Sequence, residues 1–258
     1  MTPRQVAQAV LTDKGIGRRL PVSLHRVLEN EPVLLETLST VKPFEGRFEI
    51  YRNRPVIFLN LHGCTLEEPR VRFTLAHELG HYFLHRRLLR DGRVFHDRTI
   101  RYDPDLTEVE KEANEFASEC LLPTQVVDER LKDKVLNLRL VQNLAAEATA
   151  SLQATAIKLA SLTRSRSCFF WEEDGEIVWT APSDDWRYAK FRWAGWRGSL
   201  PVGSYASRSR SSFEEREVLF SSWCPNARER AEPLFESALS TSLGRLVFVT
   251  DGIGEVYG

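Results

Sequence analysis

Three histidines at four-residue steps mark the stretch TLAHELGHYFLH, residues 74–85. They are His77, His81 and His85, and Glu78 directly follows the first of them. Residues four apart on a helix share a face about one turn apart, so the rings of His77 and His81 can meet at one metal ion. Glu78 would lie beside that ion without binding it, where it can take a proton from water on the metal. This is the chemistry of the HExxH motif.

The neighbouring residues favour a metal site over a surface helix that carries histidines by chance. They include Leu75, Ala76, Leu79, Phe83 and Leu84. These residues predict burial, and buried charged groups need partners. His85 is not expected to be a ligand of the same ion, because eight residues of continuous helix separate it from His77 by about 12 Å. We expect His85 to pack in the core or to line the substrate rim.

A second helix, predicted over about 107–120 and stopped by Pro123, offers the missing ligand. Its sequence is TEVEKEANEFASECLLP, in which Thr107 and Glu110 fit a capping box. The candidate carboxylates on this helix are those of Glu108, Glu110, Glu112 and Glu115. One carboxylate from such a helix completes a site of two histidines and one glutamate, which leaves a position for water.

Among these glutamates we favour Glu110 as the metal ligand. Asn114 lies four residues further on the same face, where it can hold the ring N–H of a ligand histidine. Glu112 points about 200° away from Glu110 on the helix and cannot share that role. We expect Glu112, like Glu108 and Glu115, to face solvent.

The two segments together resemble the ImmA/IrrE family of zinc metallopeptidases. The first is RFTLAHELGHYFLH, and the second resembles the pattern ExEANxFAxxxLLxP, which residues 110–122 match and Pro123 ends one position early. Where the family commonly ends in LLMP, this chain has Cys-Leu-Leu-Pro and lacks the methionine. The resemblance covers about residues 44–123. It implies a zincin-like fold in which zinc is bound by His77, His81 and Glu110.

The resemblance also implies a function. Members of this family cleave helix-turn-helix transcriptional repressors and so switch on stress or mobile-element genes. One alternative is a non-catalytic, metal-stabilised regulator that binds DNA or a repressor, and another is a toxin–antitoxin component. Glu78 favours the endopeptidase, because a pure binding protein needs no carboxylate next to water on zinc.

The elements around the motifs predict an α+β fold with a zincin-like metallopeptidase domain over 1–123. Residues 2–40 look helical in pieces, two β-runs cover 44–51 and 55–62, and a helix covers 70–89. We expect residues 55–63 to form an open edge strand that pairs with an extended peptide substrate. The candidates for the side chain that stabilises the oxyanion are His62, Tyr82, His85 and His96, and the sequence does not choose among them.

A helical extension is predicted over 124–165. Residues 144–162 have the spacing of a helix-turn-helix, with Thr149 where a glycine is usual. DNA binding is weakly supported, because the second helix offers only Lys158 as a basic residue before Arg164. We favour a helical pair packed on the protease domain. Six arginines between 86 and 101 could attract an acidic partner or nucleic acid, although a solvated loop is the default.

Residues 166–258 predict a C-terminal, β-rich mixed α/β domain that we expect to be regulatory. Asp174-Gly175 is a hairpin signal, and LGRLVFVT at 243–250 is a further β-run. The C-terminal region is rich in tryptophan, which is more often a core residue than a ligand platform. The tryptophans expected in the core are Trp186, Trp193, Trp196 and Trp223.

Composition limits which partners and which cellular compartment the protein is expected to have. The formal net charge of −1 over 258 residues provides no global field for DNA or an anionic membrane. The four cysteines are widely spaced and form no CxxC pair, which suits a reducing compartment. The N-terminus lacks the apolar core of a signal peptide, and no apolar run is long enough to span a bilayer. We therefore expect a cytoplasmic protein with a protein substrate and no membrane partner.

Overall fold

The computed structural model describes residues 1–41, 44–87, 95–96, 107–188, 198–208, 212–223 and 233–252. The chain divides into two compact units, the first formed by Met1–Val126 with Ala146–Ser151 and the second by Val127–Ala145 with Leu152–Gly258. The fold is mixed α/β, with one sheet in each unit within these ranges. The three-part division at 123 and 165 stays a prediction.

The described strands of the first unit form a sheet with the order β1-β3-β2-β4. They are β1 (Leu34–Leu38), β2 (Gly46–Tyr51), β3 (Arg54–Asn60) and β4 (Phe95–His96). Strand β3 pairs in parallel with β1 and antiparallel with β2, so the prediction of an open edge at 55–63 is wrong. The run Val56-Ile57-Phe58-Leu59 indicates an inner strand, because continuous apolar residues are typical of a strand that is covered on both faces.

The sequence predicts helical segments over residues 2–40, but the structure places the outer strand β1 there. Residues 34–38 instead extend the sheet, with Leu34 opposite Val56 and Leu38 opposite Asn60. The segment is short and mostly exposed, so its apolar residues carry no clear helical or strand period. Pairing with β3 decides its conformation.

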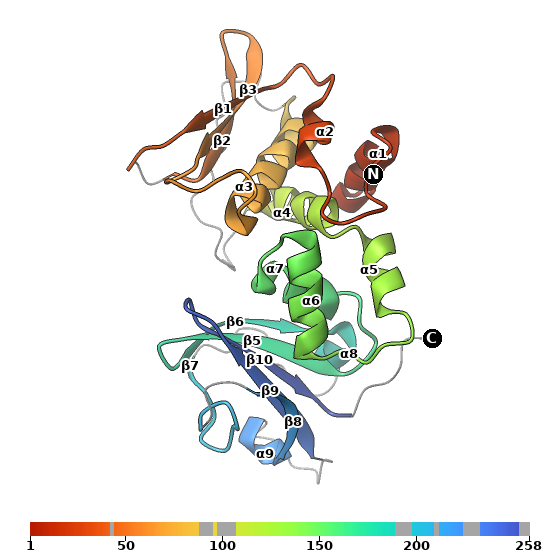
Figure 1. The fold of residues 1–258 in the computed structure, drawn as a ribbon, viewed down its shortest axis with the longest axis vertical. Helices are drawn as coiled ribbons and strands as arrows, with labels where there is room; N and C mark the ends of the chain where they lie inside the picture. Colours follow the sequence, from red (N-terminus) through yellow and green to blue (C-terminus); the bar gives the residue numbers. More distant parts are fainter. Residues whose placement is uncertain are drawn as a thin grey trace. The chain divides into compact units, whose positions relative to one another are not determined.

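The helices of the first unit pack against one another, and α3 (Pro69–Gly80) lies beside the sheet (Figure 1). The others are α1 (Pro3–Asp13), α2 (Leu24–Leu28), the π-helical turn η1 (His81–His85), α4 (Glu108–Leu121) and the start of α5 (Thr124–Leu131). Helix α3 contacts β2 and β3, and α4 contacts both α3 and α1. The helix predicted over 70–89 is therefore an α-helix to Gly80 that widens into a π-turn.

Helices α3 and α4 approach each other closely at Gly80. A Cβ atom on Gly80 would lie 3.0 Å from Cα and 3.1 Å from the carbonyl oxygen of Ala113. Beside this crossing, the rings of Phe83 and Phe116 stack with their centroids 5.7 Å apart. The small pair Gly80 and Ala113 lets polar side chains on the flanks of the two helices reach one another.

The second unit contains a sheet with the order β7-β6-β5-β10-β9-β8, and its described strand pairs are antiparallel. The strands are β5 (Ser167–Glu173), β6 (Glu176–Pro182), β7 (Gly198–Ser199), β8 (Ser212–Val218), β9 (Leu234–Ser240) and β10 (Arg245–Thr250). Asp174 and Gly175 have φ values of 52° and 87° between β5 and β6, which confirms the predicted hairpin. Strand β10 confirms the β-run near the C-terminus.

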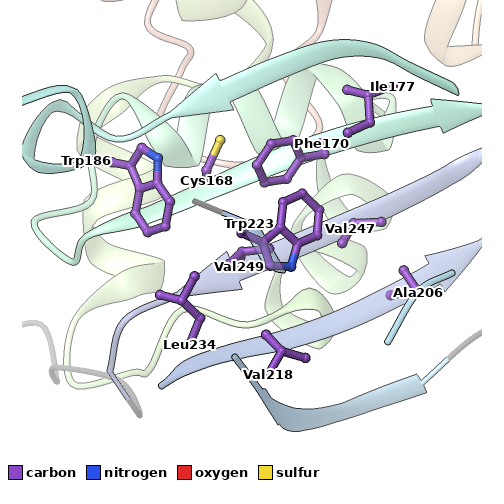
Figure 2. Packing of buried hydrophobic residues seen from close by; sticks show 11 residues of the cluster. Cys168, Phe170, Ile177, Trp186, Ala206, Val218, Trp223, Leu234, Val247 and Val249 are labelled. Atoms are coloured by element: carbon purple, nitrogen blue, oxygen red, sulfur yellow. The ribbon is translucent and has the colours of Figure 1, made fainter. Parts of the chain in front are cut away.

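Large apolar side chains fill the core of this second unit (Figure 2). The rings of Phe170 and Trp223 face each other with centroids 4.5 Å apart. Trp186 and Trp223 are buried, as predicted. Trp193 and Trp196 lie outside the described residues.

The remaining helices of the structure are α6 (Leu138–Ala148), α7 (Leu152–Ala160), α8 (Asp184–Tyr188) and α9 (Phe220–Trp223). Thr149, in the turn between α6 and α7, has a left-handed φ of 50°. Helix α7 packs on β5 and β6, and Lys158 is buried. Burial withdraws from solvent the one cation that α7 could offer to DNA. The expectation that the helical pair packs on the protease domain stays a prediction.

Candidate metal centre

Three side chains from α3, η1 and α4 converge on one point. His77 Nε2 lies 3.0 Å from His81 Nε2 and 3.1 Å from a carboxylate oxygen of Glu110. His81 Nε2 lies 3.6 Å from the same oxygen. In the described part of the chain, these three residues are a group whose ligand atoms all lie within 4.8 Å of one another. Two imidazole nitrogens and one carboxylate oxygen suit a divalent transition metal.

The local fold explains this convergence. His77 lies in the last turn of α3 and His81 opens η1, so the two positions are four residues apart and share one face. Asn114, on α4, lies 2.9 Å from the other ring nitrogen of His77. When Nδ1–H of His77 donates to the Asn114 oxygen, the lone pair of Nε2 points toward His81 and Glu110. The structure thus places Asn114 and Glu110 on the face where the spacing predicted them.

The electrostatics favour a site that is ready for a cation. Burial lowers the pKa of His81 to about 4, although the carboxylate of Glu110 opposes this shift. Burial raises the pKa of Glu110, but the neighbouring rings of His77 and His81 outweigh this effect and lower the pKa to about 2. At neutral pH the His81 ring is therefore neutral and Glu110 is ionised, as ligands of a metal must be.

The stability of the metal-free protein should fall as the pH drops below about 6.5. His81 has a lower pKa when folded, so between about pH 6.5 and pH 4 the unfolded chain takes up a proton that the folded chain does not. Glu110 adds a loss from about pH 4.5 to pH 2, because its folded pKa is also lowered. We expect His81 to account for about 1 to 3 kcal/mol. Urea unfolding across this range measures the free energy of unfolding at each pH. In a His81→Gln variant this free energy should fall less steeply between about pH 6.5 and pH 4. Equal slopes in the variant and the wild type would contradict the role given to His81.

Glu78 is completely buried on α3 and lies against the start of β2. A Cβ atom on Gly46 would lie 2.6 Å from Oε1 of Glu78 and 2.5 Å from Cγ2 of Thr74. Position 46 therefore accepts only glycine without a shift of the carboxylate. Sequence reasoning missed Gly46, although a glycine inside a strand is a known sign of close backbone approach.

Two predictions about the glutamate helix need correction. Thr107 is the N-cap residue of α4, but its side chain makes no capping hydrogen bond, so the predicted capping box is wrong. The Glu110 carboxylate turns to the histidines instead. Glu112 does not simply face solvent, because its carboxylate lies 2.9 Å from Nε2 of His85.

The other predicted positions differ in what they can do. His85 is buried, which favours the expected role in packing over a role at the rim. The Tyr82 hydroxyl is committed to Glu31, to which it donates a hydrogen bond of 3.0 Å. His62 lies 3.2 Å from the carbonyl oxygen of Phe44. The side chain of His96 lies outside the described residues, as do the arginines at 90, 93, 98 and 101.

Comparison with known proteins finds a peptidase family model that matches about half of the chain. The family model of Peptidase M78, the IrrE N-terminal-like domain, matches residues 35–160. A solved structure of a Mycobacterium tuberculosis transcriptional regulator is 14% identical, with a TM-score of 0.58, over 96% of this chain and 74% of that one. At this identity the likeness concerns the fold alone. No curated protein gives a significant match. Among the described helices, none has the length and apolar character that crossing a membrane requires.

Proposed function

Because residues 35–160 belong to the Peptidase M78 family of metallopeptidases, as the motif resemblance predicted, we propose that this chain is a zinc-dependent endopeptidase. The observation that carries the proposal is the convergence of His77, His81 and Glu110. Two histidines and one glutamate form the ligand set of zinc peptidases that keep a fourth position for water and substrate. Glu110 is only partly buried, which leaves this side of the site accessible.

Within this proposal each residue has one task. His77, His81 and Glu110 hold the metal, and Asn114 orients His77 through its Nδ1–H. Zinc bound there would polarise the scissile carbonyl and lower the pKa of the attacking water. Glu78 takes the proton from that water and passes it to the leaving amine as the peptide bond breaks. Its close packing against Gly46 holds the carboxylate in place during both transfers.

The proposed substrate is a helix-turn-helix transcriptional repressor. The ImmA/IrrE resemblance supports this substrate, and the solved M. tuberculosis protein of similar fold is named as a transcriptional regulator. A repressor substrate would place the activity in the cytoplasm. The β-rich second unit would then regulate the peptidase.

Cleavage of a repressor by purified protein tests the proposed function. We expect the zinc-loaded chain to cut a helix-turn-helix repressor from the same genome at a discrete peptide bond, and a zinc chelator to stop the reaction. Intact-mass measurements of each repressor after incubation identify the bond. Tight repressor binding without cleavage, by a chain that holds one zinc ion, would instead support the non-catalytic regulator.

A further inference from the structure

The imidazole ring of His81 also contacts His85, which in turn contacts Glu112. Nδ1 of His81 lies 3.1 Å from Nδ1 of His85. Nε2 of His85 in turn lies 2.9 Å from a carboxylate oxygen of Glu112. The three groups form a continuous chain from the proposed metal ligand to a carboxylate that is half exposed.

The hydrogen bonds in this chain have one consistent direction. An ionised carboxylate only accepts, so Glu112 selects the form of His85 that carries its proton on Nε2. The Nδ1 atom of a neutral His85 is then an acceptor, and it receives the proton that His81 carries on Nδ1. This arrangement leaves the Nε2 lone pair of His81 unprotonated. That nitrogen is the one that faces His77 and Glu110.

From this chain we propose that His85 and Glu112 are positioning residues, which orient His81 and keep its Nε2 available to a metal. The inference rests on the proposed function, because it concerns the same site. Helix α4 would then orient both histidines: Asn114 acts directly on His77, and Glu112 acts on His81 through His85. Metal-binding histidines generally need such a partner on the second ring nitrogen.

The fold explains why a residue on the other flank of α4 takes part. Gly80 meets Ala113 where the two helices cross, so Asn114 and Glu112 lie on different sides of that contact. The π-turn η1 carries His81 and His85, and their ring centroids are 5.2 Å apart. Single π-turns are rare and occur frequently at functional sites. In this protein the specific role of the π-turn would be to align the ligand His81 with the supporting His85.

Two substitutions of His85 separate positioning from simple packing. His85→Leu keeps an apolar side chain in the buried space but removes the acceptor, whereas His85→Asn is smaller but provides an amide oxygen near the place of Nδ1. We expect His85→Leu to weaken zinc binding about 10- to 100-fold and His85→Asn to remain within about threefold of the wild type. Competition of the purified full chain with a chelating dye measures the zinc Kd. If leucine were tolerated as well as asparagine, or better, packing would explain His85 and the proposal would fail.

Glu112, the exposed end of the hydrogen-bonded series, provides a test that does not disturb the core. Glu112→Ala should weaken zinc binding about 3- to 10-fold, and Glu115→Ala on the same helix is the matched control with no expected change. Ring nitrogen NMR of the metal-free protein should show His81 protonated at Nδ1 in the wild type and a mixture of tautomers in Glu112→Ala. Equal Kd values and unchanged tautomers would overturn the positioning role. A wild type that binds no zinc would refute the proposed function instead, so the two failures are distinguishable.

Discussion

Replacing Glu78 with glutamine should lower peptide hydrolysis by at least about 100-fold while one zinc ion stays bound per chain. Glutamine has the same size but cannot take a proton from water, and general acid–base catalysis contributes typically about 10²- to 10⁴-fold. The substitution adds no volume at a position where Gly46 already lies against the carboxylate. The measurements are kcat/KM on the identified repressor and the zinc content of the same preparation.

The choice of control decides how this result is interpreted. Glu115→Gln makes the same chemical change on an exposed position and should leave kcat/KM unchanged. Equal melting temperatures of the zinc-loaded proteins would exclude unfolding as the cause of lost activity. Hydrolysis that survived in Glu78→Gln, with zinc bound, would remove Glu78 from the mechanism and with it the main reason to prefer an enzyme over a metal-stabilised regulator.

Replacing Glu110 with alanine should have the largest effect on metal binding. Loss of outer-shell partners typically costs about 10- to 100-fold in metal affinity, and a direct ligand should cost more than about 100-fold. The carboxylate oxygen lies 3.1 Å from Nε2 of His77, so its removal takes away the third ligand atom of the group. Zinc per chain after dialysis and the Kd from chelator competition are the quantities to compare.

Glu115→Ala again provides the comparison, because it removes an identical side chain from the same helix. It should bind one zinc ion as tightly as the wild type. Retention of zinc by Glu110→Ala with wild-type affinity would show that another carboxylate is the third ligand. Glu112 is then the next residue to test, since its carboxylate already reaches His85 in this region.

The local parts of the site could be predicted from sequence because they depend on helical spacing. His77 and His81 lie four apart, as do Glu110 and Asn114, and such pairs share a face whatever the rest of the fold does. The hairpin at Asp174-Gly175 was predictable for a similar reason, because few residue pairs adopt two left-handed φ values without strain. These features need only neighbouring residues.

The parts that failed depend on contacts between distant segments. Strand β3 is central because β1 adds to it in parallel, and the sequence of β1 alone does not specify that pairing. The position of Glu112 on an isolated helix predicts that it faces solvent. In the structure, the close crossing at Gly80 and the π-turn bring His85 to it. Gly46 matters through the Glu78 side chain, which comes from a different element.

The division of the centre between two helices bears on how the activity arises during synthesis. His77 and Glu110 are 33 positions apart in the sequence, so a chain that has emerged only as far as the HExxH segment lacks the third ligand. A chain in which α3 and α4 have come apart likewise has the two histidines without the carboxylate of Glu110 beside them. In the proposed peptidase, catalytic competence therefore appears only after α3 and α4 have packed, and neighbouring proteins are not exposed to cleavage by unfinished copies.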